Sequence, residues 1–254
     1  MSTKRPTALV TGATYGIGAA TAVALARDGF DVAVSELAPE NLSATVKAIT
    51  AQAARAVPVA LDVRSMASIE GAVAQVLATF GDLDVLVNNA GVPLTRPAVD
   101  VTEAEWDEVV GVNLRGAFFM SQQMGRHLIA RGRPGAIVSI ASTHGVTGIA
   151  GRSTYGIAKG GIVQMTRMLA IEWAQHQIRV NAVAPATVET PSRAAILNAD
   201  PKRREMMINR IPLGRFGTAE EMADAVAYLA SPRAASSPGR RCSSTAGSPR
   251  TDPA

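Results

Sequence analysis

Short apolar runs typical of β-strands alternate with longer helical patterns along the first 183 residues. This alternation requires right-handed crossovers and gives a parallel sheet with helices on both faces. The strand segments are almost wholly apolar, as expected where both faces of a sheet are buried. The predicted strands are Thr7–Thr11, Asp31–Ser35, Val57–Leu61, Asp84–Val87, Ala136–Ile140 and Arg179–Val183. The predicted helices are Gly16–Asp28, Pro39–Ala54, Ser65–Phe80, Thr102–Arg131, Thr154–Gln175 and Thr218–Ala230. We therefore expect an α/β fold with a doubly wound parallel sheet.

The length of 254 residues suits one large domain, which we place at residues 1–233. Hydrophobic residues make up 47% of the chain, and no run approaches the roughly 18 apolar residues of a membrane span. The segment Met1–Pro6 is too short and polar for a secretory signal, so we expect a cytoplasmic protein. The single cysteine, Cys242, excludes an internal disulfide. No spacing of ligands predicts a metal site.

The formal charge of +4 does not indicate nucleic-acid binding. Residues 234–254 contain three arginines and one aspartate, so half of the net charge lies in this tail. Basic clusters elsewhere are short, whereas a nucleic-acid footprint needs a continuous basic face. The tail also lacks Val, Ile, Leu, Met and Phe, so it cannot bury enough surface to order itself. We expect no nucleic-acid or membrane partner, and a disordered tail.

A glycine-rich turn joins the first predicted strand to the first predicted helix. Glycines allow a tight turn, and the helix N-terminus that follows favours an anion such as a pyrophosphate. The spacing is Gly-x3-Gly-x-Gly, and a simple tight connection is the alternative interpretation. The position after the first strand favours a dinucleotide site. Its expected contacts are Gly12, Tyr15, Gly16, Ile17 and Gly18.

Acidic residues end the second and third predicted strands. Glu36 can accept hydrogen bonds from an adenosine ribose and would repel a 2′-phosphate. Tyr15 is uncharged, and no Arg or Lys follows Glu36 before Lys47. These features favour NAD over NADP, although a solvated strand-end charge is the alternative for Glu36. Asp62, with Val63 after it, could meet the adenine amino group.

Tyr155 and Lys159 lie four residues apart and therefore share a helix face. A free tyrosine has a pKa near 10, and a nearby ammonium group would lower it enough for proton transfer. Ser142 follows the fifth predicted strand, where ligands of open parallel sheets bind, and could hold the substrate oxygen. Asn113 could hold a water molecule that links Lys159 to solvent. These four residues predict acid–base chemistry at a substrate oxygen.

In these motifs the chain resembles the short-chain dehydrogenase/reductase family. The matching residues are the glycine turn, Asn88-Asn89-Ala90-Gly91, Asn113, Ser142, Tyr155-x3-Lys159 and Asn181-x3-Pro185. The resemblance covers about residues 5–232 and implies a Rossmann-like fold with a catalytic tetrad of Asn113, Ser142, Tyr155 and Lys159. It also implies that Asn89, Val188, Thr190, Tyr155 and Lys159 contact the cofactor. A homo-oligomer, tetramer or dimer, is implied as well.

Two features depart from the family pattern. Ala186 follows Pro185 where the family usually has glycine, and a methyl group there narrows the backbone's freedom. The tail lacks the usual last strand, which in the family reads approximately Phe-Val-Thr-Gly and ends in Val-Asp-Gly-Gly. A one-base frameshift near Ala235 would explain this, because shifting the reading frame can restore that pattern. Loss of the strand would weaken the oligomer.

The substrate determinants are predicted more loosely. His144, Leu94 and Arg152 are candidate substrate contacts, and a locally bonded loop histidine is the alternative for His144. Residues 186–213 resemble a lid with a short helix. Met206, Met207 and Ile208 could form its apolar underside, and helix packing is the rival interpretation.

The main functional hypothesis is an NAD(H)-dependent oxidoreductase acting on a small secondary alcohol, polyol, sugar or cyclic alcohol, or on the matching ketone. The first alternative is a 3-oxoacyl thioester reductase that uses NADPH and recognises an acyl carrier protein. The second belongs to another class, an inactive binding or regulatory protein that keeps the fold.

Overall fold

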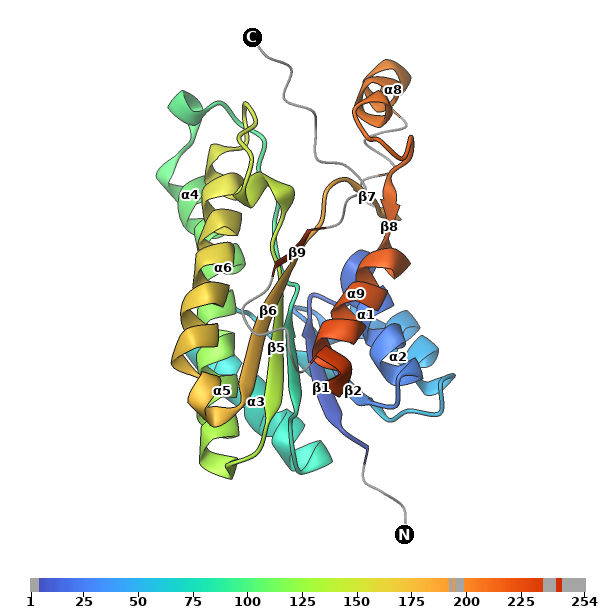
Figure 1. The fold of residues 1–254 in the computed structure, drawn as a ribbon, viewed down its shortest axis with the longest axis vertical. Coiled ribbons are helices and arrows are strands. Elements are labelled where there is room, and N and C mark those ends of the chain that lie inside the picture. Colours follow the sequence, from blue (N-terminus) through green and yellow to red (C-terminus); the bar gives the residue numbers. More distant parts are fainter. Residues whose placement is uncertain (1–4, 192–193, 195–198, 235–240, 244–254) are drawn as a thin grey trace.

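A parallel sheet forms the centre of the molecule (Figure 1). The computed structural model describes residues 5–191, 194, 199–234 and 241–243. The strand order is β3-β2-β1-β4-β5-β6-β9, so the chain reverses direction across the sheet between β1 and β4. The six long strands are β1 Thr7–Thr11, β2 Asp31–Glu36, β3 Ala56–Ala60, β4 Val85–Asn88, β5 Gly135–Ile140 and β6 Ile178–Ala184. The predicted doubly wound parallel sheet is confirmed.

Helices cover both faces of the sheet and enclose two apolar cores (Figure 1). One face carries α1 Gly16–Arg27, α2 Ser43–Thr50 and α9 Ala219–Ala230. The other carries α3 Met66–Phe80, α5 Ala117–Arg131 and α6 Ser153–Glu172. Strand residues alternate between the cores, so Leu9 faces one and Val10 the other. This burial on both faces explains why the strands are apolar throughout.

The predicted helix over Thr102–Arg131 is interrupted rather than continuous. It consists of α4 Glu103–Val110, the π-helical segment Gly111–Gly116 and α5. The middle segment packs tightly, since a Cβ at Gly116 would lie 2.8 Å from the Val63 side chain. Wide π-helical turns inside α-helices often mark functional sites. The sequence does not reveal this change, because a single π-helical turn lies inside a stretch that is helical throughout.

Capping explains where two helices begin. Thr102 and Glu105 form a capping box at the start of α4, and Thr218 and Glu221 form another at the start of α9. The predicted helix from Pro39 begins instead as the 3₁₀ turn Pro39–Leu42 and continues as α2.

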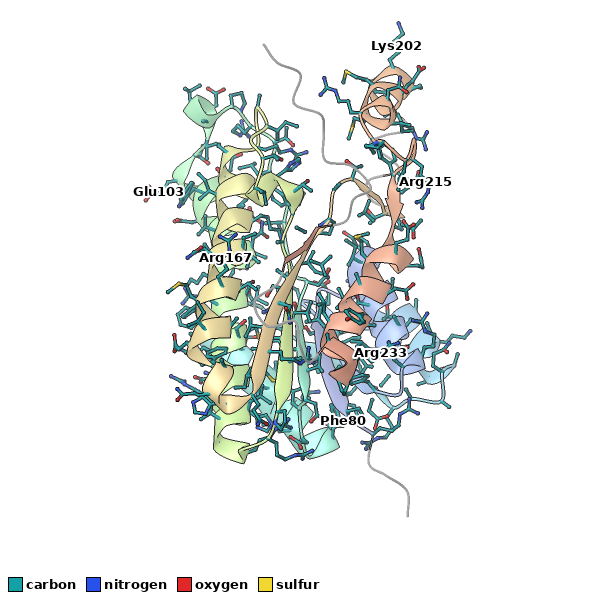
Figure 2. The ribbon with its side chains drawn as sticks, in the orientation of Figure 1. Phe80, Glu103, Arg167, Lys202, Arg215 and Arg233 are labelled. Carbon is teal, nitrogen blue, oxygen red and sulfur yellow. The ribbon has the colours of Figure 1, made fainter. Side chains whose placement is uncertain are left out.

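The segment between β6 and α9 lies beyond the carboxyl ends of the strands of the central sheet (Figure 1). It contains the short pair β7 Val188–Glu189 and β8 Gly217–Thr218, and the helix α8 Pro201–Asn209. Figure 2 shows the labelled Lys202 and Arg215 on this segment, at the opposite end of the molecule from Phe80. The apolar side chains here pack together: Met207 and Ile208 lie against Ile211 and Phe216. Met206 is 50% exposed. Packing within the segment is therefore confirmed for Met207 and Ile208.

The prediction that the last strand is missing requires correction. Three residues, β9 Arg241–Ser243, pair in parallel with Ala182–Ala184 at the edge of the sheet. The physical reason is that the outer edge of β6 presents backbone N–H and C=O groups, which an extended segment can pair with whatever its side chains. Residues 235–240 and 244–254 of the tail lie outside the described residues.

Two kinds of feature are absent from the described residues. No helix there has the length and apolar character needed to cross a membrane. No group of three or more His, Cys, Asp and Glu side chains there is arranged to hold a metal ion.

Candidate active site

The glycine turn leads from β1 into α1 with little space to spare. Gly12 and Gly16 have φ angles of 65° and 62°, in the left-handed region that favours glycine. A Cβ at Gly18 would clash with the Gly12 carbonyl oxygen. At the start of α1, Tyr15 is the N-cap residue and gives no side-chain cap, and the first turn carries no acidic residue. The helix N-terminus thus fits the pyrophosphate of a dinucleotide.

Two residues hold this turn against the end of β4. The Thr11 hydroxyl accepts hydrogen bonds from the backbone N–H groups of Asn89 and Ala90, each at 3.0 Å. The Asn89 side-chain amide donates to the carbonyl oxygens of Thr11 at 2.9 Å and Gly12 at 2.7 Å. Asn89 therefore positions the turn through the backbone. In the sequence, the only signal for this role of Thr11 is its place at the end of a strand.

The acidic residue after β2 is already anchored by its neighbours. One Glu36 carboxylate oxygen accepts from the Thr14 hydroxyl at 3.0 Å, and the other accepts from the Leu37 backbone N–H at 3.0 Å. Thr14 belongs to the glycine turn, so Glu36 lies beside the expected pyrophosphate site. A carboxylate held here suits an adenosine ribose and opposes a 2′-phosphate. The sequence gives no signal for this role of Thr14 beyond its place in the glycine turn.

The predicted adenine contact, Asp62, is engaged with its own neighbour. Its carboxylate accepts hydrogen bonds from the Arg64 backbone N–H at 2.9 Å and from the Arg64 guanidinium at 3.1 and 3.0 Å. These bonds, led by those from the Arg64 side chain, lower the pKa of Asp62. Val63 is buried beside Gly116. The adenine contact of Asp62 stays a prediction.

Asn113 lies in the π-helical segment and is 1% exposed. Its side-chain oxygen accepts from the Val92 backbone N–H at 2.7 Å, and its amide donates to the Val92 carbonyl at 2.9 Å. This pair of bonds ties the loop after β4 to the π-helical turn. The side chain is thus held by the backbone, and the predicted link to Lys159 through water stays a prediction.

Ser142, Tyr155 and Lys159 lie at the carboxyl end of β5. The buried Ser142 hydroxyl accepts from the His144 backbone N–H at 3.2 Å, which leaves its own proton able to donate. Tyr155 and Lys159 are on α6, and the Lys159 ammonium nitrogen lies 5.8 Å from the centre of the Tyr155 ring. The segment after β5 is tied to β6, because the Thr143 N–H donates to the Pro185 carbonyl at 3.0 Å.

Lys159 is a buried cation beside Tyr155. It is 4% exposed, and its ammonium donates to the Ile140 carbonyl at 2.6 Å. Burial lowers the pKa of Lys159 to about 8, because desolvation disfavours the charged form. The ammonium still carries most of its charge at neutral pH. It can therefore stabilise a nearby phenolate, as acid–base chemistry at Tyr155 requires.

The structure also locates the predicted substrate contacts. The His144 ring packs edge-on against Tyr155, with 6.1 Å between ring centres. The Arg152 guanidinium donates to the Leu94 carbonyl at 3.1 Å, so these two residues come together. Val188 is buried in β7, and the Thr190 side chain faces the glycine turn, 3.2 Å from where a Cβ at Gly16 would lie.

The chain is similar in sequence and structure to several known proteins. A family model described as enoyl-(acyl carrier protein) reductase matches residues 12–247. A 3-oxoacyl-[acyl-carrier-protein] reductase of Thermotoga maritima is 40% identical over 88% of this chain and 89% of its own. Xylitol dehydrogenase with bound NAD⁺ superposes with a TM-score of 0.90 at 30% identity, covering 95% of this chain and 98% of that one. A variant of actinorhodin polyketide ketoreductase with NADPH superposes with a TM-score of 0.92 at 36% sequence identity, and the match covers 97% of this chain and 98% of that one.

The chain belongs to the short-chain dehydrogenase/reductase family. It is therefore an oxidoreductase of a family whose structures bind nicotinamide dinucleotides. The solved neighbours include both an NAD⁺ complex and an NADPH complex. The glycine turn, Asn89 and the uncapped start of α1 are the residues of this chain that fit such a cofactor.

Proposed function

We propose that the protein is an NAD(H)-dependent dehydrogenase that interconverts a secondary alcohol and its ketone, with Tyr155 as the general acid and base. One observation carries the proposal. Tyr155 and the buried Lys159 share one face of α6 at the carboxyl end of β5, near Ser142. Ligands of open parallel sheets bind at this edge.

The protein's own residues move and hold a proton. The Ser142 hydroxyl donates a hydrogen bond to the substrate oxygen, and the Tyr155 phenol exchanges a proton with that oxygen. The Lys159 ammonium stabilises the phenolate that remains after proton donation. Asn113 keeps the adjoining loop in place through Val92. Bound NAD⁺ would supply the hydride acceptor, so that the alcohol and NAD⁺ would become the ketone, NADH and one proton.

The charge of Glu36 supports the choice of NAD(H) over NADP(H). The Glu36 carboxylate beside the glycine turn favours a free ribose 2′-hydroxyl over a 2′-phosphate. The glycine turn would hold the pyrophosphate, with Val188 and Thr190 at the nicotinamide end. Asp62 and Val63 would border the adenine.

The direct test follows the absorbance of reduced nicotinamide with a panel of alcohols and ketones. We expect turnover with NADH or NAD⁺, and a loss of about 10²- to 10⁴-fold in Tyr155→Phe, the typical contribution of general acid–base catalysis. NADH binding should survive. Tyr228→Phe, on the exposed side of α9, is the matched control and should keep full activity. Undiminished turnover in Tyr155→Phe would overturn the proposal.

A second candidate is a 3-oxoacyl thioester reductase, which the 40% identity to the Thermotoga maritima reductase supports. This activity would require reduction of a 3-oxoacyl thioester with NADPH. A non-catalytic role is disfavoured, since the surroundings of Tyr155 suit proton transfer. Comparing NADPH-dependent thioester reduction with NADH-dependent ketone reduction separates the two enzymatic candidates.

We also propose that the protein forms a homo-oligomer. Apolar side chains lie exposed on the outer sides of α5 and α6, including Phe118, Ile129, Ile157, Met168 and Ile171. An exposed apolar surface of this kind often marks an interface. Light scattering on the purified protein tests this, and a monomer at all concentrations would contradict it.

A further inference from the structure

Asp62, the predicted adenine contact, forms a bidentate ion pair with Arg64 in the loop after β3. The Asp62 Oδ1 atom accepts hydrogen bonds from the Arg64 backbone N–H at 2.9 Å and from its Nε at 3.1 Å, and Oδ2 accepts from Nη2 at 3.0 Å. Two parallel bonds from a guanidinium fix the plane of a carboxylate, which a single ammonium cannot do. Arg64 therefore sets the orientation of the Asp62 side chain.

One acceptor site of this carboxylate remains open. An ionised carboxylate has about four lone-pair sites. The bonds from Arg64 use two sites on Oδ1 and one on Oδ2, and no other donor to the carboxylate lies within the part of the chain that the structure describes. The Asp62 side chain is 32% exposed, so a ligand can reach the open site. The exocyclic amino group of adenine is a donor of the kind that this site accepts.

Hydrogen bonds to the start of α3 hold the backbone of Asp62. Its N–H donates to the Ser68 hydroxyl at 2.9 Å, and its carbonyl accepts from the Ser65 N–H at 3.1 Å. Ser65 is itself the N-cap residue of α3 and accepts from the Ser68 N–H. The backbone of Asp62 is thus fixed by the helix, and only its side-chain torsions remain for Arg64 to set.

The π-helical segment holds Arg64 in turn. The Cγ and Cδ atoms of Arg64 lie 3.8 and 3.9 Å from where a Cβ at Gly111 would lie, so the aliphatic stem runs over the start of this segment. The Arg115 guanidinium donates to the Arg64 carbonyl at 2.7 Å and lies over the Phe119 ring, 4.7 Å from its centre. Arg64 therefore has less freedom than an ordinary surface arginine, and its pair with Asp62 costs less entropy to form.

We propose that Arg64 is a positioning residue for the cofactor, which holds the Asp62 carboxylate so that its open acceptor site receives the exocyclic amino group of adenine. The inference rests on the cofactor site of the proposed function. It does not depend on the choice between NAD(H) and NADP(H), because both contain adenine. A mobile carboxylate loses side-chain entropy when a ligand binds, whereas a carboxylate fixed in advance does not. Arg64 thus raises the affinity for the dinucleotide by acting through Asp62.

Calorimetric titration with NADH and with deamino-NADH tests the inference by binding alone. Deamino-NADH carries hypoxanthine, in which a carbonyl oxygen replaces the amino group and would face the carboxylate as a second acceptor. We expect the wild type to bind NADH about 10- to 100-fold more tightly than deamino-NADH, the range for a hydrogen bond to a charged group. Asp62→Ala should abolish this preference, which checks the adenine contact itself.

Arg64→Met keeps the aliphatic stem over Gly111 and removes the planar fork. It should weaken the binding of NADH by about three- to tenfold, the cost of ordering one mobile side chain, and leave deamino-NADH within about twofold. Arg64→Lys should weaken NADH binding by a similar factor, because an ammonium does not hold both carboxylate oxygens in one plane. In steady-state assays, both variants should raise KM for NADH and leave kcat within about twofold.

Arg27→Met is the matched control, because Arg27 forms an exposed ion pair with Asp224 at 2.9 Å, at the end of α1 opposite to the glycine turn. It should change the binding of neither dinucleotide. An Arg64→Met protein that binds NADH as well as the wild type, or that loses equal affinity for both dinucleotides, would overturn the inference. Equal binding of both by the wild type would overturn it as well. A retained preference for NADH without any turnover would count against the proposed function alone.

Discussion

The two ends of the sheet treat buried charge in opposite ways. At the carboxyl ends of the strands, Lys159 is buried, and its ammonium donates to the Ile140 carbonyl. At the amino ends, the Asp82 carboxylate accepts hydrogen bonds from Arg131, Arg133 and His127. Both side chains are largely shielded from solvent. Among the described residues, only Asp82 has partners of opposite charge.

The pKa values follow from this difference. Burial lowers the pKa of Lys159 to about 8. Burial raises the pKa of Asp82, but the hydrogen bonds from Arg131, the Leu83 N–H and His127 outweigh it and bring the pKa to about 2. A charge that is paired stabilises the fold, whereas a desolvated charge without a counter-ion destabilises it and becomes chemically useful. The sheet thus keeps stability at one end and reactivity at the other.

The largest expected effect comes from removing the unpaired charge. Lys159→Met should lower kcat/KM by about 10³-fold and raise the free energy of unfolding at pH 7 by about 3 kcal/mol. The folded protein binds fewer protons at Lys159 than the unfolded chain between about pH 8 and pH 10.5. The wild type therefore gains stability relative to the variant as the pH rises through this range. Urea unfolding at pH 7 and pH 9.5 measures both effects.

Lys47→Met, at an exposed position on α2, is the control and should change neither quantity. A Lys159→Met protein less stable than the wild type at pH 7 would show that desolvation is not the dominant energy at this end of the sheet.

Removing the paired charge of Asp82 should have the opposite effect on the free energy of unfolding. Asp82→Asn should lower the free energy of unfolding by about 2 kcal/mol at pH 7 and leave kcat/KM within about twofold. The depressed pKa of Asp82 stabilises the fold above about pH 4, and this stabilisation is lost as the pH falls through about 2. Denaturant unfolding between pH 7 and pH 2.5 should therefore show the two proteins converging. Asp100→Asn, at an exposed position, is the control, and a constant difference would contradict the assignment.

A smaller effect concerns the cofactor. Glu36→Gln removes the charge beside the glycine turn and should raise kcat/KM for NADPH relative to NADH by about fivefold, from a repulsion of roughly 1 kcal/mol in partly exposed surroundings. Steady-state kinetics with both cofactors measures the ratio. Glu40→Gln, four residues later and exposed, should leave the ratio unchanged. An unaltered ratio in Glu36→Gln would remove the charge argument for NAD.

The smallest effect concerns the tail. Truncation after Ala234 removes the three-residue pairing of β9 with β6 and should lower the free energy of unfolding by about 1 kcal/mol, the typical net contribution of a backbone hydrogen bond. Thermal unfolding of the wild-type and truncated proteins measures this difference.

We also propose a frameshift near Ala235. Gene sequencing tests this, because the idea requires that a one-base change restore a frame ending in Val-Asp-Gly-Gly.

Much of the fold could be predicted from local patterns. The six long strands and the helix α9 agree with the predicted bounds to within a residue or two. The π-helical turn around Asn113 and the short β9 could not, because the first lies inside a stretch that is helical throughout and the second contains no apolar run. The roles of the predicted site residues remain predictions, although the structure places them at the same end of the sheet.

By itself the sequence determined the parallel α/β architecture, the glycine turn and the pairing of Tyr155 with Lys159, because each depends on residues within a few turns of one another. Tertiary structure decided what holds these residues: Val92 for Asn113, Ile140 for Lys159 and Leu94 for Arg152. These partners lie 19 to 58 residues away along the chain. Their distances and burial follow from how the layers pack, and that packing sets the pKa of Lys159.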